Sequence, residues 1–244
     1  MKKSLYIVTG SSKGLGQALV EQLIQSDENL VVGISRSIVD EKDNFRPVKL
    51  DLADIDLLIS QMDNIFATGD FQHVFLINNA GWIGEIAPLG NLDPMGIQEI
   101  QAINVIAPSL LMNEFVKRYH HLEGKKVVVN ISSGAAAKAI DGWSGYCSSK
   151  AALNQLSLVA EEESKLKGLG IKYYALSPGI IDTPMQEEIR SVAKENFSNI
   201  EKFKSYKSQN QLSTPEEVAG KVIYLMDHPE KFKGVLQDVR EFHL

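Results

Sequence analysis

Tyr146 and Lys150 are the two side chains of this sequence best suited, by type and spacing, to move a proton. Of the seven tyrosines, only Tyr146 is followed by a lysine four residues later, and on a helix that spacing puts both side chains on one face. A tyrosine hydroxyl has a reference pKa of about 10, and a neighbouring ammonium lowers it by favouring the phenolate. The pair therefore predicts a general acid–base catalyst. On its own, each residue could equally serve in packing or at the surface.

Ser133 and Asn104 are expected to join this pair. Ser133 ends the strand-like run 127–133, so its hydroxyl should emerge where ligands bind in open sheets and bond a substrate carbonyl. Asn104 lies four residues before Pro108, which has no N–H to donate to the Asn104 carbonyl. We expect a kink there, with a water on the freed carbonyl that links Lys150 to solvent. A proline simply tolerated in a covered helix is the alternative.

A glycine-rich turn, Thr9-Gly-Ser-Ser-Lys-Gly-Leu-Gly16, precedes these residues. It follows a strand-like run and opens a helix, where free N–H groups and the positive helix end can bind a dinucleotide pyrophosphate. Gly10, Ser12, Lys13 and Gly16 are the expected contacts, and an ordinary glycine turn is the alternative.

The end of the second strand-like run distinguishes NADH from NADPH. An acidic residue there would accept the ribose 2′-hydroxyl, whereas a cation would hold a 2′-phosphate. The sequence reads Gly33-Ile-Ser-Arg-Ser37, so Arg36 stands where a carboxylate would, with Lys13 expected on the same side. We predict NADP(H) as the cofactor, the alternative being that both cations are only surface residues.

The elements that must position these residues alternate regularly along the chain. Strand-like runs fall at 5–9, 30–35, 47–51, 74–78, 127–132 and 171–177, with a short last one at 235–239. Stretches of helical periodicity such as 15–25 separate them, which predicts an α/β fold with a doubly wound parallel sheet (Rossmann fold). We expect one domain over 1–244. The polar, aromatic-interrupted segment 185–211 should form a helical flap, and Thr214-Pro-Glu-Glu217 a capping box.

Composition narrows the functional class. The 244 residues carry a formal net charge of −6 with mixed signs, which argues against nucleic acid as the main partner. No run of about 18 apolar residues is present and no leader is evident, so we expect no membrane span and a cytoplasmic protein. The one cysteine, Cys147, excludes an internal disulfide, and no Cys/His cluster predicts a metal site.

Together these motifs resemble the short-chain dehydrogenase/reductase family over essentially the whole chain, including Asn78-Asn-Ala-Gly81 and Pro178-Gly-Ile-Ile-Asp-Thr183. The resemblance implies that Asn104, Ser133, Tyr146 and Lys150 form a catalytic tetrad. It also implies cofactor contacts from Leu15 at the pyrophosphate, Asp51 and Leu52 at the adenine, Asn79, Ala80 and Gly81 at the adenine ribose, and Ile181 and Thr183 at the carboxamide, with Pro178, Tyr146 and Lys150 completing the set.

A closer similarity is to the sepiapterin reductase branch and, within it, to bacterial benzil reductases that form (S)-benzoin. It is carried by Val129-Asn-Ile-Ser-Ser-Gly-Ala-Ala136, Gly142-Trp-Ser-Gly-Tyr-Cys147, Ser177-Pro-Gly-Ile-Ile-Asp-Thr-Pro-Met-Gln186 and Gln237-Asp-Val-Arg-Glu-Phe242. This similarity implies reduction of one carbonyl of a 1,2-diketone to a hydroxy ketone, with substrate contacts from Ser133, Trp143, Tyr146, Gly179 and Met185. Asp238 matches the tail aspartate by which sepiapterin reductases anchor the pterin. A solvated carboxylate is the alternative for Asp238.

Two other functions stay open. The same groups would serve a sepiapterin-type or acyl-carrier-protein ketone reductase, and a dinucleotide-sensing protein could keep the fold without turnover. We also expect a homodimer, paired through the long helices that contain Asn104 and Tyr146.

Overall fold

Seven parallel strands form the central sheet of the structure, a computed structural model that describes residues 3–37 and 40–242. In space the strands follow the order β3-β2-β1-β4-β5-β6-β7. The order reverses between β1 and β4, where the doubly wound fold has its switch point. The doubly wound parallel sheet expected from the sequence is therefore confirmed. The strands are β1 (Lys3–Thr9), β2 (Asn29–Ser35), β3 (Phe45–Lys49), β4 (Phe71–Asn78), β5 (Lys126–Ile131), β6 (Ile171–Ser177) and β7 (Leu236–Asp238).

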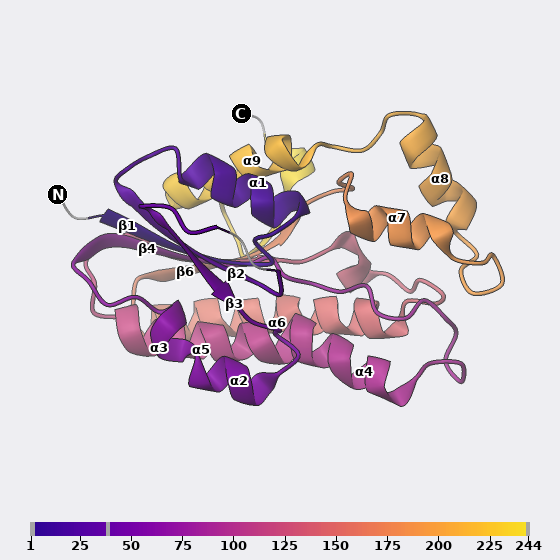
Figure 1. Cartoon of the computed structure of the whole chain (residues 1–244), viewed down its shortest axis with the longest axis horizontal. Coiled ribbons are helices and arrows are strands. Elements are labelled where there is room, and N and C mark those ends of the chain that lie inside the picture. Colours follow the sequence, from indigo (N-terminus) through magenta and orange to yellow (C-terminus); the bar gives the residue numbers. More distant parts are fainter. Residues whose placement is uncertain (1–2, 38–39, 243–244) are drawn as a thin grey trace.

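Helices cover both faces of this sheet (Figure 1). On one face lie α1 (Gly14–Leu23) and α9 (Pro215–Asp227), and on the other α4 (Pro94–Gln101), α5 (Ala107–Tyr119) and α6 (Ser144–Lys167), with the short α2 (Ile55–Ser60) and α3 (Met62–Ile65) beside them. The flap segment forms α7 (Pro184–Ser191) and α8 (Ile200–Ser208) at one end of the sheet. Short 3-10 turns, η2 (Gly134–Ala137), η3 (Pro229–Lys231) and η4 (Val239–Glu241), complete the chain.

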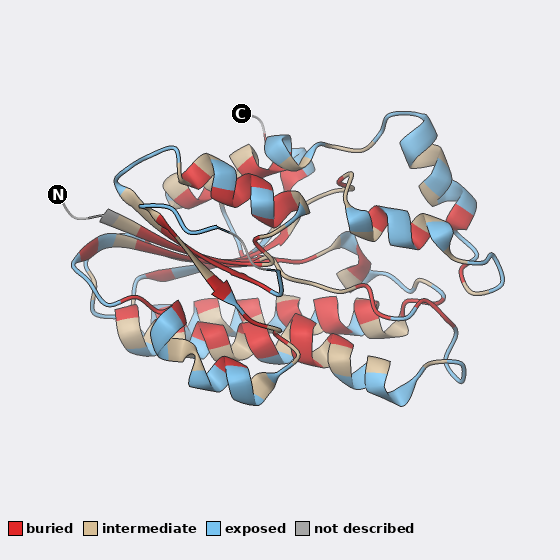
Figure 2. Cartoon of the chain, in the orientation of Figure 1, coloured by how far each residue is buried: buried red, intermediate tan, exposed pale blue. Residues whose placement is uncertain are grey.

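Alternating residues of β1, β2, β4, β5 and β6 supply two hydrophobic cores, one on each face of the sheet. Figure 2 shows these strands and the sheet-facing sides of the helices as largely buried. In β1, Tyr6 and Val8 pack towards α1 and α9, while Leu5 and Ile7 pack towards α5. All six residues of β5 are buried, as expected for a central strand covered on both sides. A third, smaller cluster joins the flap to the start of α6.

Local signals set most element boundaries. The capping box forms as expected: Glu217 N donates to Thr214 Oγ1 at 3.2 Å and Thr214 N to Glu217 Oε2 at 3.1 Å. Pro47 lies inside β3, which tolerates it because β3 is an edge strand paired only with β2. The last strand is shorter than expected because Val239 begins η4.

The kink expected near Pro108 takes the form of a π-helical segment, η1 (Ala102–Ile106), between α4 and α5. Short π-helical segments within α-helices often occur at functional sites. Asn104 lies in it and is completely buried. Among the helices of the described residues, none is long and apolar enough to cross a membrane.

Candidate active site

The carboxyl ends of the central strands open into a cavity of about 1060 Å³. Its walls come from the glycine turn after β1, the ends of β2, β4, β5 and β6, the first turns of α6, and the flap. Since these ends meet at the switch point of the sheet, this is where the fold places a ligand.

Tyr146 and Lys150 lie on one face of α6 and both line the cavity, as their spacing predicts. The Lys150 ammonium donates to the Ile131 carbonyl at 2.8 Å and stands 5.7 Å from the centre of the Tyr146 ring. Ser133 follows β5 and lines the same cavity, where its Oγ also accepts from Ala135 N at 3.1 Å. The structure therefore brings three of the four expected catalytic side chains together.

The Asn104 side chain takes a different place from the other three. Its Oδ1 accepts from Trp82 N, and its Nδ2 donates to the Trp82 carbonyl, both at 2.9 Å. Nδ2 also donates to Ser149 Oγ at 3.0 Å, on the buried side of α6. These bonds tie the π-helical segment to α6 and to the loop after β4, so the Asn104 side chain positions the site rather than facing substrate.

Burial controls the charges of the catalytic pair. Burial raises the pKa of Tyr146 to about 12, and a hydrogen bond with Ser133 opposes that rise. Burial also lowers the pKa of Lys150 to about 8. The net lowering of the tyrosine pKa expected from Lys150 is not found in this structure: desolvation of the phenolate raises the pKa, and the opposing hydrogen bond comes from Ser133. With this pKa the Tyr146 hydroxyl keeps its proton near neutral pH.

The glycine turn has the form that a dinucleotide needs. Lys13 is the N-cap residue of α1, and its side chain has no acceptor with which to cap the first N–H groups of the helix. An anion such as a phosphate can accept from them instead. Gly10, with φ +69°, packs so closely on the loop after β4 that a Cβ would lie 3.0 Å from Ala80 Cα. These features fit a bound pyrophosphate.

Of the residues expected to contact the cofactor at this turn, Gly10, Ser12, Lys13 and Leu15 line the cavity. Gly16 does not. A Cβ on Gly16 would lie 2.1 Å from the Gly10 carbonyl oxygen, so this glycine allows close packing of α1 against the turn.

Residues expected around the adenosine also line the cavity: Arg36, Asp51, Leu52, Asn79, Ala80 and Gly81. Thr9 holds part of this wall, because its buried Oγ1 accepts from Asn79 N at 3.0 Å and from Ala80 N at 2.9 Å. Sequence reasoning missed this role of Thr9. Pro178, Ile181 and Thr183 line the other end of the cavity, beside the flap.

An aromatic wall, which we define as Trp143, Phe197 and Phe203, stands at the substrate end. Trp143 and Phe203 line the cavity, and the fully buried Phe197 packs behind them. Trp143 stacks on Phe197 with 5.2 Å between ring centres and meets Phe203 edge to face at 5.4 Å. The expected contacts Trp143, Gly179 and Met185 all line the cavity.

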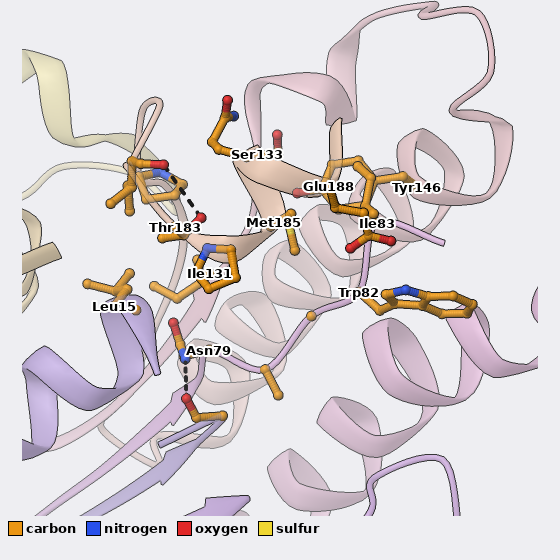
Figure 3. A pocket seen from close by; sticks show the side chains of 18 of the residues that line it. Leu15, Asn79, Trp82, Ile83, Ile131, Ser133, Tyr146, Thr183, Met185 and Glu188 are labelled. Atoms are coloured by element: carbon orange, nitrogen blue, oxygen red, sulfur yellow. Dashed lines mark hydrogen bonds between the residues drawn. The ribbon is translucent and has the colours of Figure 1, made fainter. Parts of the chain in front are cut away.

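Three further lining residues, Trp82, Ile83 and Glu188, were missed by the sequence reasoning (Figure 3). Trp82 and Ile83 directly follow the Asn78–Gly81 motif, and Glu188 lies one helical turn after Met185. Because these neighbours were expected at the site, the three residues could have been predicted from their positions in the sequence.

Asp238 does not line the cavity. Its carboxylate accepts from Arg240 N at 3.0 Å and from Arg240 Nε at 2.9 Å, and it pairs with the same guanidinium a second time. Arg240 lines the cavity instead. The tail therefore presents a guanidinium, with Asp238 behind it, where a pterin anchor was expected.

This fold and site define an oxidoreductase of the NAD(P)H-dependent class that acts on CH–OH or carbonyl groups. The chain belongs to the short chain dehydrogenase family, whose model matches residues 4–194. It is 35% identical over 242 residues, 98% of this chain and 99% of the relative, to the benzil reductase ((S)-benzoin forming) of Bacillus subtilis (strain 168). Sepiapterin reductase of Mus musculus is 30% identical over 82% of this chain and 83% of its own.

A solved short chain dehydrogenase/reductase from Saccharomyces cerevisiae superposes with a TM-score of 0.84 at 25% identity, over 98% of this chain and 96% of that one. The family resemblance noted from the motifs is therefore confirmed.

Proposed function

We propose that this protein is an NADPH-dependent carbonyl reductase that reduces one carbonyl of a 1,2-diketone, such as benzil, to the (S)-hydroxy ketone. One observation carries the proposal. Ser133 and Tyr146 line a cavity with the glycine turn at one end and an aromatic wall at the other. Aryl groups pack well against such a wall. The full-length similarity to a benzil reductase supports the same substrate class.

The chain's own residues have distinct roles in this reaction. The bound dinucleotide would supply hydride to the carbonyl carbon. Tyr146 donates its proton to the carbonyl oxygen, and the Ser133 hydroxyl bonds the same oxygen. Lys150, held by the Ile131 carbonyl, stands beside the Tyr146 ring and favours return of a proton to it. A water on the Asn104 carbonyl would complete the path to solvent.

NADPH is proposed over NADH because of the charges at the adenosine end. Arg36 and Lys13 line the cavity there, and β2 ends in Ser35-Arg36-Ser37 without a carboxylate. An Arg36→Ala variant should raise KM for NADPH by about tenfold, since a charge-assisted contact is lost, and leave KM for NADH within about twofold. Preference of the wild type for NADH would overturn this assignment.

The central experiment follows NADPH consumption at neutral pH with benzil, sepiapterin and a simple aliphatic diketone. Oxidation with benzil that vanishes in Tyr146→Phe, with chiral analysis giving (S)-benzoin, is the expected result. Failure to turn over any carbonyl despite tight NADPH binding would favour the dinucleotide-sensing alternative.

A sepiapterin-type reductase is the second candidate, favoured by the similarity to the mouse enzyme. Against it stands the Asp238 carboxylate, which is already bonded by Arg240 and lies outside the cavity lining. Sepiapterin turned over faster than benzil in the same assay would reverse this order.

We further propose a cytoplasmic homodimer paired through the long helices. Exposed apolar residues on α6 and on the π-helical segment, Leu158, Val159 and Ile106, support such an interface. Light scattering coupled to size exclusion that shows only monomer would remove the dimer.

A further inference from the structure

The loop between α7 and α8 docks on the three residues that precede the catalytic helix. Asp141 Oδ2 accepts from Ser198 N at 2.7 Å, and Asp141 Oδ1 accepts from Ser198 Oγ at 2.9 Å and from Asn199 Nδ2 at 3.4 Å. The backbone N–H of Ser198 holds the pKa of the Asp141 carboxyl below its usual range. The carboxylate therefore binds the end of the loop that leads into α8.

The next two residues extend the same contact. Gly142, with φ +72°, lies so close to the loop that a Cβ there would stand 2.3 Å from the Asn196 carbonyl oxygen. Trp143 then stacks on Phe197, with the ring planes 12° apart. Asp141, Gly142 and Trp143 thus meet residues 196–199 through a hydrogen-bonded, a backbone and an aromatic contact. We call this set the flap contact.

The flap contact lies one helical turn from the catalytic tyrosine. Trp143 is the N-cap residue of α6, and its ring meets the Tyr146 ring edge to face with 5.6 Å between centres. Both rings belong to the third hydrophobic cluster, together with Ile189, Phe197 and Ile200 of the flap. A change in the position of the flap would therefore also change the shape of the aromatic wall.

A separate contact shows which part of the flap relies on Asp141. The far end of α8 is tied separately, by the ion pair between Lys207 and Asp182. Asp141 is thus placed to hold the end of the flap formed by the loop between α7 and α8.

We propose that Asp141 is a positioning residue for the aromatic wall. By holding residues 196–199 against the start of α6, it fixes Trp143, Phe197 and Phe203 and sets the preference for aryl over alkyl ketones. The inference deepens the proposed function and rests on it for the substrate class. Asp141 acts through the flap, since its bonds go to Ser198 and Asn199 and it does not line the cavity.

Hydrogen exchange of the full-length protein tests the contact without any turnover. Asp141→Ala should speed exchange in peptides covering residues 192–203, because Ser198 N loses its acceptor. Asp141→Asn, which keeps one oxygen acceptor, should restore part of the protection. Asp54→Ala is the matched control: Asp54 caps α2 through Leu57 N at 2.9 Å and should change only peptides near that helix. Unchanged protection of 192–203 in Asp141→Ala would overturn the positioning role.

Kinetics then test the selectivity. For Asp141→Ala we expect KM for benzil to rise about fivefold to tenfold with kcat within about twofold, as loss of an ordered aromatic contact implies, while KM for 2,3-butanedione stays unchanged. Asp141→Asn should recover most of the difference and Asp54→Ala should show none. Equal changes for both diketones would overturn the selectivity claim. A wild type that reduces neither diketone would refute the proposed function, while the exchange result would still decide the role of Asp141.

Discussion

Replacing Thr9 by valine should destabilise the loop after β4 that contains Asn79 and Ala80, and with it the whole protein. Valine keeps the shape and removes the buried hydroxyl, which accepts from Ala80 N at 2.9 Å and from Asn79 N at 3.0 Å. Asn79 N keeps a second acceptor, the Ile77 carbonyl at 3.0 Å, so its loss is small. Ala80 N, in a part-buried hydrogen bond, loses its hydroxyl acceptor, and a donor left unpaired away from water costs about 1–3 kcal/mol. We expect a total of about 2 kcal/mol, or about 4–8 °C in Tm for a chain of this length.

Urea unfolding of Thr9→Val and of the matched Thr9→Ser measures this cost. Serine keeps the accepting oxygen and loses only a methyl group, so it should retain most of the stability. The valine variant should also bind NADPH more weakly, because Asn79 and Ala80 line the cavity. Equal free energies of unfolding for the two variants would refute the assignment of Thr9 as the acceptor that holds this loop.

Three other changes have defined outcomes. Burial lowers the pKa of Lys150 from 10.5 to about 8, so between these values the unfolded chain binds more protons at this residue than the folded chain. Relative to Lys150→Met, wild-type stability should therefore rise by about 2 kcal/mol between pH 7.5 and 9.5 in urea unfolding. The comparison stays below pH 10 because buried tyrosines with raised pKa values, such as Tyr146, oppose the rise at higher pH. Gly16→Ala should cost about 3 kcal/mol or more, because its Cβ would overlap the Gly10 carbonyl. Gly220→Ala in α9 should be neutral or stabilising, because the nearest atom to its Cβ, Gln22 Oε1 of α1, is 3.9 Å away. Similar unfolding curves for the two variants would contradict this packing argument. Thr214→Ala removes the capping box of α9 and should lower Tm by about 2–4 °C in calorimetry, and an unchanged Tm would show that the cap contributes nothing.

The features that sequence reasoning found are those encoded over short distances. Tyr146 and Lys150 share a helix face because they are four residues apart, and the Thr214–Glu217 box forms within one turn. The parallel order of the strands follows from the alternation of strands and helices and the handedness of their connections. Each of these depends on a local pattern that the folded chain does not override.

The features that sequence reasoning missed depend on contacts between distant residues or on competition for one group. Thr9 supports residues about 70 positions away, and no local pattern announces that bond. The direction of the Tyr146 pKa shift depends on burial by neighbouring elements, which spacing to a lysine does not report. Asp238 was expected to anchor a ligand, but its carboxylate instead accepts hydrogen bonds from Arg240, two residues later.

The proposed proton-transfer residues and the proposed substrate-contacting residues are held in place by different parts of the structure. Lys150 is held by a backbone carbonyl of β5 and Asn104 by the backbone of Trp82, so the proton-transfer groups are fixed by the sheet and its loops. The aromatic wall, in contrast, includes Phe203 from the flap, which lines the cavity, and Phe197 packed behind it. The loop of the flap is held by contacts with Asp141 and Trp143. Substitutions in the flap contact can therefore change which carbonyl binds while leaving the proton donor in place. This separation gives a physical reason why relatives that reduce benzil or sepiapterin can be similar over most of this chain and still act on different substrates.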